Sequence, residues 1–230
     1  MIKAAIFDMD GLLINSEPFW RRSEKRVFSN LGITLKDEMF EQFMGKRIDE
    51  VVATLYRQFP WSGVSQKEVA GQIVEGVIQL VLEEGEALKG VYQTLKLLKH
   101  LNIKLALASS SYLKIITAVL EKLEIADYFE VVHSAEFEKY GKPHPQIFIT
   151  TAQKLEVDPE ECIVFEDSFN GVIAALAANM KCVAVPDPEF GEQDKFKIAN
   201  LVLNNLEEFS LAHLEMLNEG PIGTKEPKAN

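Results

Sequence analysis

The sequence predicts an α/β protein: a doubly wound core built on a parallel sheet, with an inserted α-helical cap domain. Three observations lead to this prediction. Short apolar or β-branched runs alternate with longer helical patterns, which is typical of βαβ units. One long interval between the first two runs contains helical patterns and no convincing strand pattern. Acidic, serine and lysine residues follow the ends of the predicted strands.

Six runs read as strands, and three helical patterns separate the later ones. The strand-like runs cover residues 3–7, 103–108, 129–133, 162–166, 182–185 and 200–203. The helical patterns cover residues 114–123, 146–155 and 171–179, with apolar residues spaced three and four apart. This order predicts a Rossmann-like parallel sheet with helices on both faces.

The interval that breaks this alternation reads as several helices, at residues 17–31, 48–59, 66–84 and 91–101. A single βα crossover needs far fewer residues, so we expect most of the interval to be an inserted unit. We predict a catalytic core of residues 1–15 and 87–218, a helical cap of residues 16–86 and a disordered tail of residues 219–230. Gly85 and Gly90 would give flexibility to the second of two hinges, at residues 12–17 and 83–90.

Composition excludes several classes of protein. The chain is 47% apolar and 26% charged, as in ordinary globular proteins. The apolar run that begins the sequence stops at Asp8, so we expect no secretory signal. The longest apolar runs are far shorter than a bilayer span, so we expect no transmembrane helix. We expect a cytoplasmic protein and a monomer. A formal net charge of −11 argues against nucleic-acid and membrane partners. Cys162 and Cys182 lie in apolar segments and are expected to be buried, reduced thiols.

Polar residues end the first two strands. Asp8 and Asp10, within the sequence DMDGLL, follow the first strand, and ligands of open α/β sheets gather at this edge. They also suit a turn with no function. Ser109, Ser110 and Ser111 end the second strand, where they could cap the next helix and offer donors to an oxyanion.

The later strands add a lysine and two more acids. Lys142, in KYGKPHP, precedes a predicted helix, where a cation is unfavourable on dipole grounds unless an anion lies nearby. Lys139 competes for this role, but we expect it to be an exposed surface lysine. Glu166 and Asp167 follow the fourth strand. Four strand ends thus bring catalytic residue types to one edge.

The expected convergence of these carboxylates and Lys142 indicates a bound metal ion and a phosphoryl-transfer reaction. Two carboxylates 4 Å apart repel by about 4 kcal/mol at an effective dielectric constant near 20, so a hard cation is expected. Oxygen ligands suit Mg²⁺, and the sequence offers no His or Cys cluster for zinc. With this charge neutralised, one carboxylate can attack phosphorus while a second acts as acid and then base.

Residues 8–11, Ser109, Lys142 and the Glu166–Asp167 pair resemble, in order, the four motifs of the haloacid dehalogenase-like phosphohydrolases, over residues 1 to about 190. The insertion after the first motif resembles the cap of the β-phosphoglucomutase and sugar-phosphatase branch. Residues 7–14, 45–52 and 60–61 are similar to the group of hexitol and 2-deoxyglucose-6-phosphate phosphatases.

This resemblance implies roles for the motif residues. Asp8 would be the nucleophile, Asp10 the general acid and base, and Lys142 the bridge between nucleophile and phosphate. Ser109 and the amide of Ser110 would bind the phosphoryl oxygens.

The resemblance also implies the ligands of Mg²⁺. These would be the Asp8 carboxylate, the Asp10 carbonyl and Asp167, with Glu166 as an accessory ligand or a support. We therefore expect a Mg²⁺-dependent phosphatase that acts on small phosphorylated metabolites, most of all sugar or hexitol phosphates.

The cap would supply substrate contacts, for which Trp20, Lys46, Arg47 and Trp61 are the candidates. Two alternatives to a phosphatase remain: a phosphomutase of the β-phosphoglucomutase type and a non-catalytic phosphate-binding protein. Mutases of this branch have a histidine aligned near position 20, where this chain has Trp20, which favours hydrolysis. Haloacid dehalogenation needs neither a second aspartate nor a metal, so Asp10 and Asp167 argue against it.

Overall fold

A computed structural model describes residues 1–36, 38–41, 43, 45–187 and 193–219. It contains one six-stranded sheet in the order β3-β2-β1-β4-β5-β6, and every neighbouring pair is parallel. The predicted α/β class and all six strands are confirmed, with ends shifted by two residues at most. The strands are β1 (Ala4–Phe7), β2 (Lys104–Ser109), β3 (Val131–Ser134), β4 (Cys162–Glu166), β5 (Lys181–Ala184) and β6 (Leu201–Val202).

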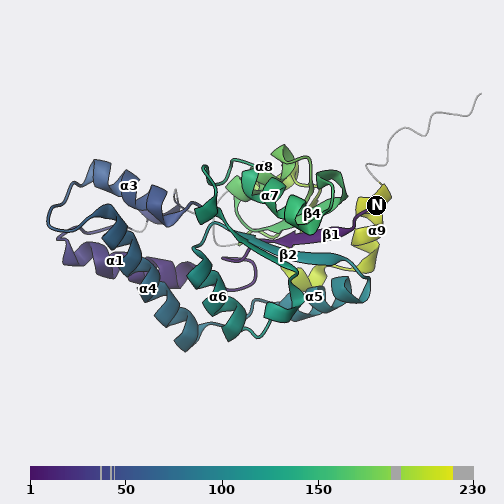
Figure 1. The fold of residues 1–230 in the computed structure, drawn as a ribbon, viewed down its shortest axis with the longest axis horizontal. Helices are drawn as coiled ribbons and strands as arrows, with labels where there is room; N and C mark the ends of the chain where they lie inside the picture. Colours follow the sequence, from purple (N-terminus) through teal and green to yellow (C-terminus); the bar gives the residue numbers. More distant parts are fainter. Residues whose placement is uncertain (37, 42, 44, 188–192, 220–230) are drawn as a thin grey trace, which may run out of the picture.

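Helices cover both faces of the sheet, as expected for a doubly wound fold (Figure 1). One face is covered by α5 and α6, and the other by α7 and α8. Their apolar sides bury the continuous hydrophobic runs of the strands, which is why those runs read so clearly in the sequence. The bounds are α5 (Val91–His100), α6 (Leu113–Lys122), α7 (Gln146–Leu155), α8 (Phe169–Ala177) and a terminal α9 (Leu211–Glu219).

The long interval between β1 and β2 is helical, as predicted. It begins with α1 (Glu17–Asn30), the short unpredicted α2 (Glu38–Glu41), α3 (Ile48–Gln58) and α4 (Gln66–Glu84). We call these four helices and their connections the insertion. Both α1 and α3 contact α4, and the three lie beyond one end of the sheet (Figure 1). By contrast α5 packs on β2 and belongs with the sheet.

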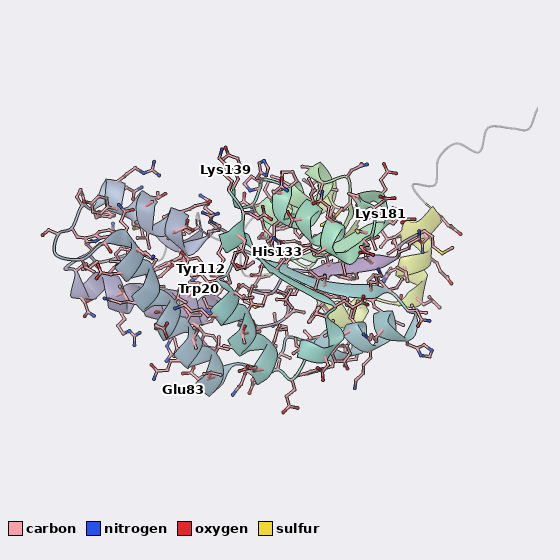
Figure 2. All side chains as sticks on the ribbon, in the orientation of Figure 1. Trp20, Glu83, Tyr112, His133, Lys139 and Lys181 are labelled. Carbon is pink, nitrogen blue, oxygen red and sulfur yellow. The ribbon has the colours of Figure 1, made fainter. Side chains whose placement is uncertain are left out.

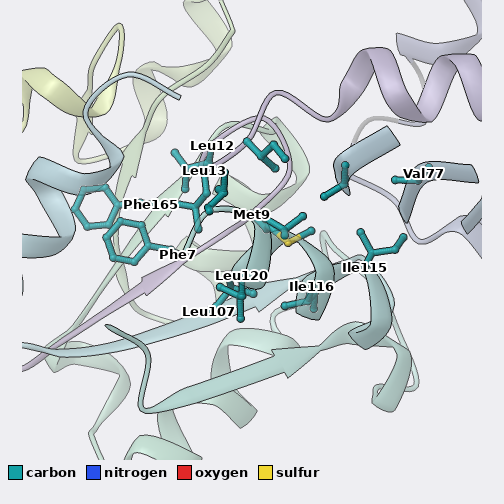
Figure 3. Packing of buried hydrophobic residues seen from close by; sticks show 14 of the residues in the cluster. Phe7, Met9, Leu12, Leu13, Val77, Leu107, Ile115, Ile116, Leu120 and Phe165 are labelled. Atoms are coloured by element: carbon teal, nitrogen blue, oxygen red, sulfur yellow. The ribbon is translucent and has the colours of Figure 1, made fainter. Parts of the chain in front are cut away.

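The chain enters and leaves the insertion at adjacent points. Ile14 forms an antiparallel bridge with Ala87, and the Leu88 amide donates to the Leu13 carbonyl at 3.0 Å. Apolar side chains continue from the sheet into the insertion: one cluster runs past Ile115 of α6 to Val77 of α4 (Figure 3). The insertion therefore shares its hydrophobic core with the sheet.

Gly90, in the second predicted hinge, lies close to the chain that follows β6. It starts α5 with a φ of 88°, and a Cβ there would lie 1.9 Å from the Glu207 backbone nitrogen. The predicted tail, 219–230, begins with Glu219 at the end of α9, and the rest lies outside the described residues. Cys162 and Cys182 are buried and free, as predicted. None of the described helices is long and apolar enough to cross a membrane.

We predict that Gly90→Ala lowers the free energy of unfolding by about 3 kcal/mol, because it adds a backbone clash to left-handed strain. Gly63 is the matched control: its φ is 87°, but no atom lies within 4 Å of the position of a Cβ. Gly63→Ala should therefore cost only about 1–2 kcal/mol. Denaturant unfolding of both variants measures the difference, and equal losses would contradict the close packing at Gly90.

Candidate active site

The carboxyl ends of β1 and β4 place Asp8 beside Glu166 and Asp167, because these two strands are neighbours in the sheet. Lys142 reaches the same point from the segment that follows β3. Its Nζ donates to Asp8 Oδ1 at 2.6 Å and also to Glu166 Oε1. Lys142 is 3% exposed and Glu166 is fully buried. Four of the predicted site residues thus meet in a buried cluster.

This cluster holds more negative than positive charge. Carboxylate oxygens of Asp8, Glu166 and Asp167 lie within 4.8 Å of one another. Lys142 forms ion pairs with two of these carboxylates, Asp8 and Glu166. Burial raises the pKa of Asp8 to about 8, although Lys142 acts in the opposite direction. Burial and the neighbouring Glu166 raise the pKa of Asp167 well above its ordinary value. A divalent cation would relieve both effects, and this all-oxygen donor set fits Mg²⁺.

Lys142 remains charged in this setting. Burial alone would lower its pKa, but the Asp8 and Glu166 carboxylates outweigh burial and hold the pKa above its ordinary value. The lysine is therefore a fixed positive charge beside Asp8.

The Glu166 carboxylate is already bonded on both oxygens. Oε1 accepts from Lys142, and Oε2 accepts from the Ser168 amide at 2.8 Å and the Ser168 hydroxyl at 2.9 Å. No donor in the described part of the chain hydrogen-bonds the Asp167 carboxylate. Asp167 is thus better placed than Glu166 to bind a metal, and Glu166 orients Lys142.

The Asp10 carboxylate joins the sheet to the insertion. It accepts from Ser16 Oγ at 2.5 Å, Trp20 Nε1 at 3.1 Å, Ser111 Oγ at 2.6 Å and Ser109 Oγ at 3.3 Å. Trp20 lies where the insertion meets the sheet (Figure 2). Sequence reasoning gave no role here to Ser16 or Ser111, although Ser111 follows two serines that it did select.

The three serines do not cap α6, so that expectation was wrong. This helix begins at Leu113, and its N-cap residue, Tyr112, makes no side-chain capping hydrogen bond. The hydroxyls have other partners: Ser111 donates to Asp10, and Ser110 donates to the Gly45 carbonyl of the insertion at 2.8 Å. The serines therefore connect the end of β2 to the insertion.

A cavity of about 650 Å³, a volume that includes open solvent, lies between the strand ends and the insertion. Seven of the predicted site residues line it: Asp8, Asp10, Trp20, Lys46, Ser109, Ser110 and Asp167.

Two glutamates of α1 also line this cavity and were not predicted. Burial raises the pKa of Glu17 to about 7, with a further contribution from Asp10. Burial raises the pKa of Glu24 to about 8, with a further contribution from Glu17, while Arg21 lowers both. A helical signal was available, because positions 17, 20, 21 and 24 share one face of a helix.

Arg47 is not among the residues that line the cavity. Its guanidinium donates to the carbonyls of Ala135, at 3.2 Å, and Glu138, at 2.8 Å, and forms two bonds with Asp49. A Cβ on Gly141, next to Lys142 in the chain, would lie 3.2 Å from Arg47 Cγ. Arg47 therefore ties the insertion to the segment that carries Lys142.

Two further sequence candidates lie away from the cavity lining. Trp61 packs edge-on against Phe28 and Tyr56 inside the insertion and donates to the Val64 carbonyl. Lys139 is exposed, as expected.

Comparison with known proteins agrees with this geometry. The sequence pattern of haloacid dehalogenase-like hydrolases matches residues 5–185. The chain belongs to this family. Hexitol phosphatase B from Escherichia coli O157:H7 is 42% identical over 214 residues, which cover 93% of this chain and 96% of that protein. On this evidence the chain is an enzyme, a phosphatase.

Solved structures of the family share the fold. CbbY from Rhodobacter sphaeroides, in complex with phosphate, superposes with a TM-score of 0.86 at 26% identity, covering 94% of this chain and all of that one. β-Phosphoglucomutase from Clostridium difficile gives a TM-score of 0.84 at 28% identity, covering 95% and 98% of the two chains. The overall fold of this phosphatase is thus shared with both neighbours.

We predict that Arg47→Ala lowers kcat/KM about tenfold for both a small aryl phosphate and a polyol phosphate, because it loosens the insertion from the Lys142 segment. Arg57→Ala is the control, since Arg57 is exposed on α3 and its guanidinium bonds Thr54. Steady-state kinetics on both esters test this. A loss confined to the polyol phosphate would instead make Arg47 a substrate contact.

Proposed function

We propose that this phosphatase hydrolyses sugar or hexitol phosphates in a Mg²⁺-dependent reaction, through an aspartyl-phosphate on Asp8. The observation that carries the proposal is the buried Asp8–Lys142 pair at a cavity that Asp8, Asp10 and Asp167 line. Similarity to hexitol phosphatase B supports the substrate class.

The chemistry proposed for the chain has two displacements. A carboxylate oxygen of Asp8 attacks phosphorus as the bond to the ester oxygen breaks, and Asp10 gives its proton to the leaving alkoxide. Asp10 then takes a proton from water as that water attacks the phosphoryl group, which releases phosphate and regenerates Asp8. Ser109 and Ser110 would hold the phosphoryl oxygens, and Lys142 would balance charge between them and Asp8.

Mg²⁺ would be held by the Asp8 carboxylate, the Asp10 carbonyl and Asp167. Glu166 would act behind them, through its bonds with Lys142 and Ser168. When bound, the ion supplies positive charge that offsets repulsion between the carboxylates and an anionic phosphoryl group.

We also propose that residues 16–86 form a cap domain over a core of residues 1–15 and 87–218. Adjacent chain crossings at Ile14 and Ala87 support these limits. Hydrogen bonds from Ser110 to Gly45 and from Trp20 to Asp10 support closure of the cap over the site. A closed cap would exclude bulk water and strengthen the electrostatic interactions inside.

Asp8→Asn should lower kcat by at least about 1,000-fold, or about 4 kcal/mol, because an amide is not a nucleophile towards phosphorus. Thermal unfolding should show an intact fold, since the change removes one of several crowded carboxylates. Asp127→Asn, at an exposed position, is the control and should retain activity.

The same assay separates hydrolysis from phosphomutation. Release of inorganic phosphate without an isomeric ester is expected from the wild type, and acid-quenched mass spectrometry should find phosphate on Asp8. Near-normal activity of Asp8→Asn would rule out the aspartyl-phosphate.

Removal of divalent cations with EDTA should abolish activity, and Mg²⁺ should restore it. Ca²⁺ should not, because it takes more ligands at longer distances and misaligns the nucleophile. Mg²⁺ should also raise the melting temperature, since it binds the folded carboxylate cluster, and Asp167→Asn should weaken this shift. Full activity in excess EDTA would refute the metal dependence.

A further inference from the structure

Glu24 is a buried carboxylate that the proposed reaction does not use. It lies on α1, is 6% exposed and lines the cavity. Among the described residues, no donor hydrogen-bonds its carboxylate, and the positive charge of Arg21 acts on it. A buried carboxylate without hydrogen bonds costs free energy, so packing alone would favour an apolar residue here. The oxygens that lack donors therefore point to a ligand that brings donors of its own.

Glu17 provides a second acceptor in the same cavity. It precedes Glu24 by seven residues, about 10 Å along α1, and shares its helical face. Both residues line the cavity, so the two carboxyl groups lie along one side of it, as an elongated ligand with several donors requires.

The remaining lining of the insertion is largely apolar. Phe40, Phe43, Ile48 and Val51 contribute to it. A ligand with a carbon chain on one side and hydroxyl groups on the other matches such a lining. Its carbon chain would pack on the apolar side chains, and its hydroxyl groups would bind the carboxyl groups.

The charge of the cavity sets a further condition. In the described part of the chain, two cationic side chains line it, and so do five carboxylates, those of Asp8, Asp10, Glu17, Glu24 and Asp167. Mg²⁺ and Lys142 would offset the negative charge of one phosphoryl group. A second anionic group near α1 would face the acidic pair directly.

On the basis of the proposed function, we infer that Glu24 and Glu17 form an acceptor site that binds the hydroxyl groups of an uncharged polyol chain and disfavours substrates with a second anionic group. These residues determine substrate specificity and take no part in bond breaking. Bisphosphates and phosphorylated sugar acids would be poor substrates for the same reason.

Three esters test the inference: glucitol 6-phosphate, 6-phosphogluconate and 4-nitrophenyl phosphate. The first two share a six-carbon hydroxylated chain but differ at the distal carbon, which is an alcohol in one and a carboxylate in the other. The third has no hydroxyl chain. We expect the wild type to prefer glucitol 6-phosphate over 6-phosphogluconate at least about tenfold in kcat/KM.

Glu24→Gln should lower kcat/KM for glucitol 6-phosphate at least about fivefold, and Glu24→Leu should lower it further, with 4-nitrophenyl phosphate changed less than about twofold. Above about pH 8, where Glu24 is ionised, Glu24→Gln should also narrow the preference for glucitol 6-phosphate over 6-phosphogluconate, because the variant lacks one repelling charge. Glu83→Gln is the control, since Glu83 lies exposed on α4 on the outer side of the insertion (Figure 2).

The outcomes separate the possible failures. Equal losses on all three esters, or no loss on glucitol 6-phosphate, would overturn the acceptor site while leaving the phosphatase intact. Absence of hydrolysis of every ester by the wild type would instead overturn the proposed function. Because Glu24→Gln replaces a buried carboxyl group, whose pKa burial raises to about 8, with an amide of the same shape, the melting temperature of the variant should equal or exceed that of the wild type. A folded Glu24→Gln that binds glucitol 6-phosphate unchanged also counts against the inference.

Discussion

The burial of three carboxylates around Lys142, at the carboxyl end of the sheet, is the constraint on which the site depends. Such groups repel strongly where water is excluded, and Lys142 alone leaves an excess of negative charge. The backbone must also make room for them: a Cβ on Gly11, whose φ is 75°, would lie 2.1 Å from Asp167 Oδ2. A rigid parallel sheet can hold this arrangement because its neighbouring strands fix where the acids emerge.

The insertion is joined to this cluster by polar contacts rather than by its apolar core alone. Asp10 accepts hydrogen bonds from α1 and from the end of β2, so the position of the proposed general acid and base and the position of the insertion depend on each other. Arg47 adds a similar tie to the segment that carries Lys142. Closure over the cavity would therefore organise the reacting groups as well as enclose the substrate.

Much of the core could be read from the sequence. Strands buried on both faces appear as continuous apolar runs, and β4 was predicted with the bounds that the structure has. Short or weakly patterned elements were missed, such as α2 with four residues and α9 near the end of the chain. The serine cap was predicted wrongly because a serine after a strand suits several partners, and only the approach of Asp10 and Gly45 selects among them.

By itself, the sequence determined which residue types leave each strand, and parallel order then requires them to meet at one edge. It also determined the family, because four motifs stand in order. Only the tertiary structure decided where the insertion's side chains go. Arg47 turns to backbone carbonyls, whereas Glu24 faces the cavity. Helical periodicity tells which face of α1 is buried, but its partners come from distant parts of the chain, and packing alone brings them together.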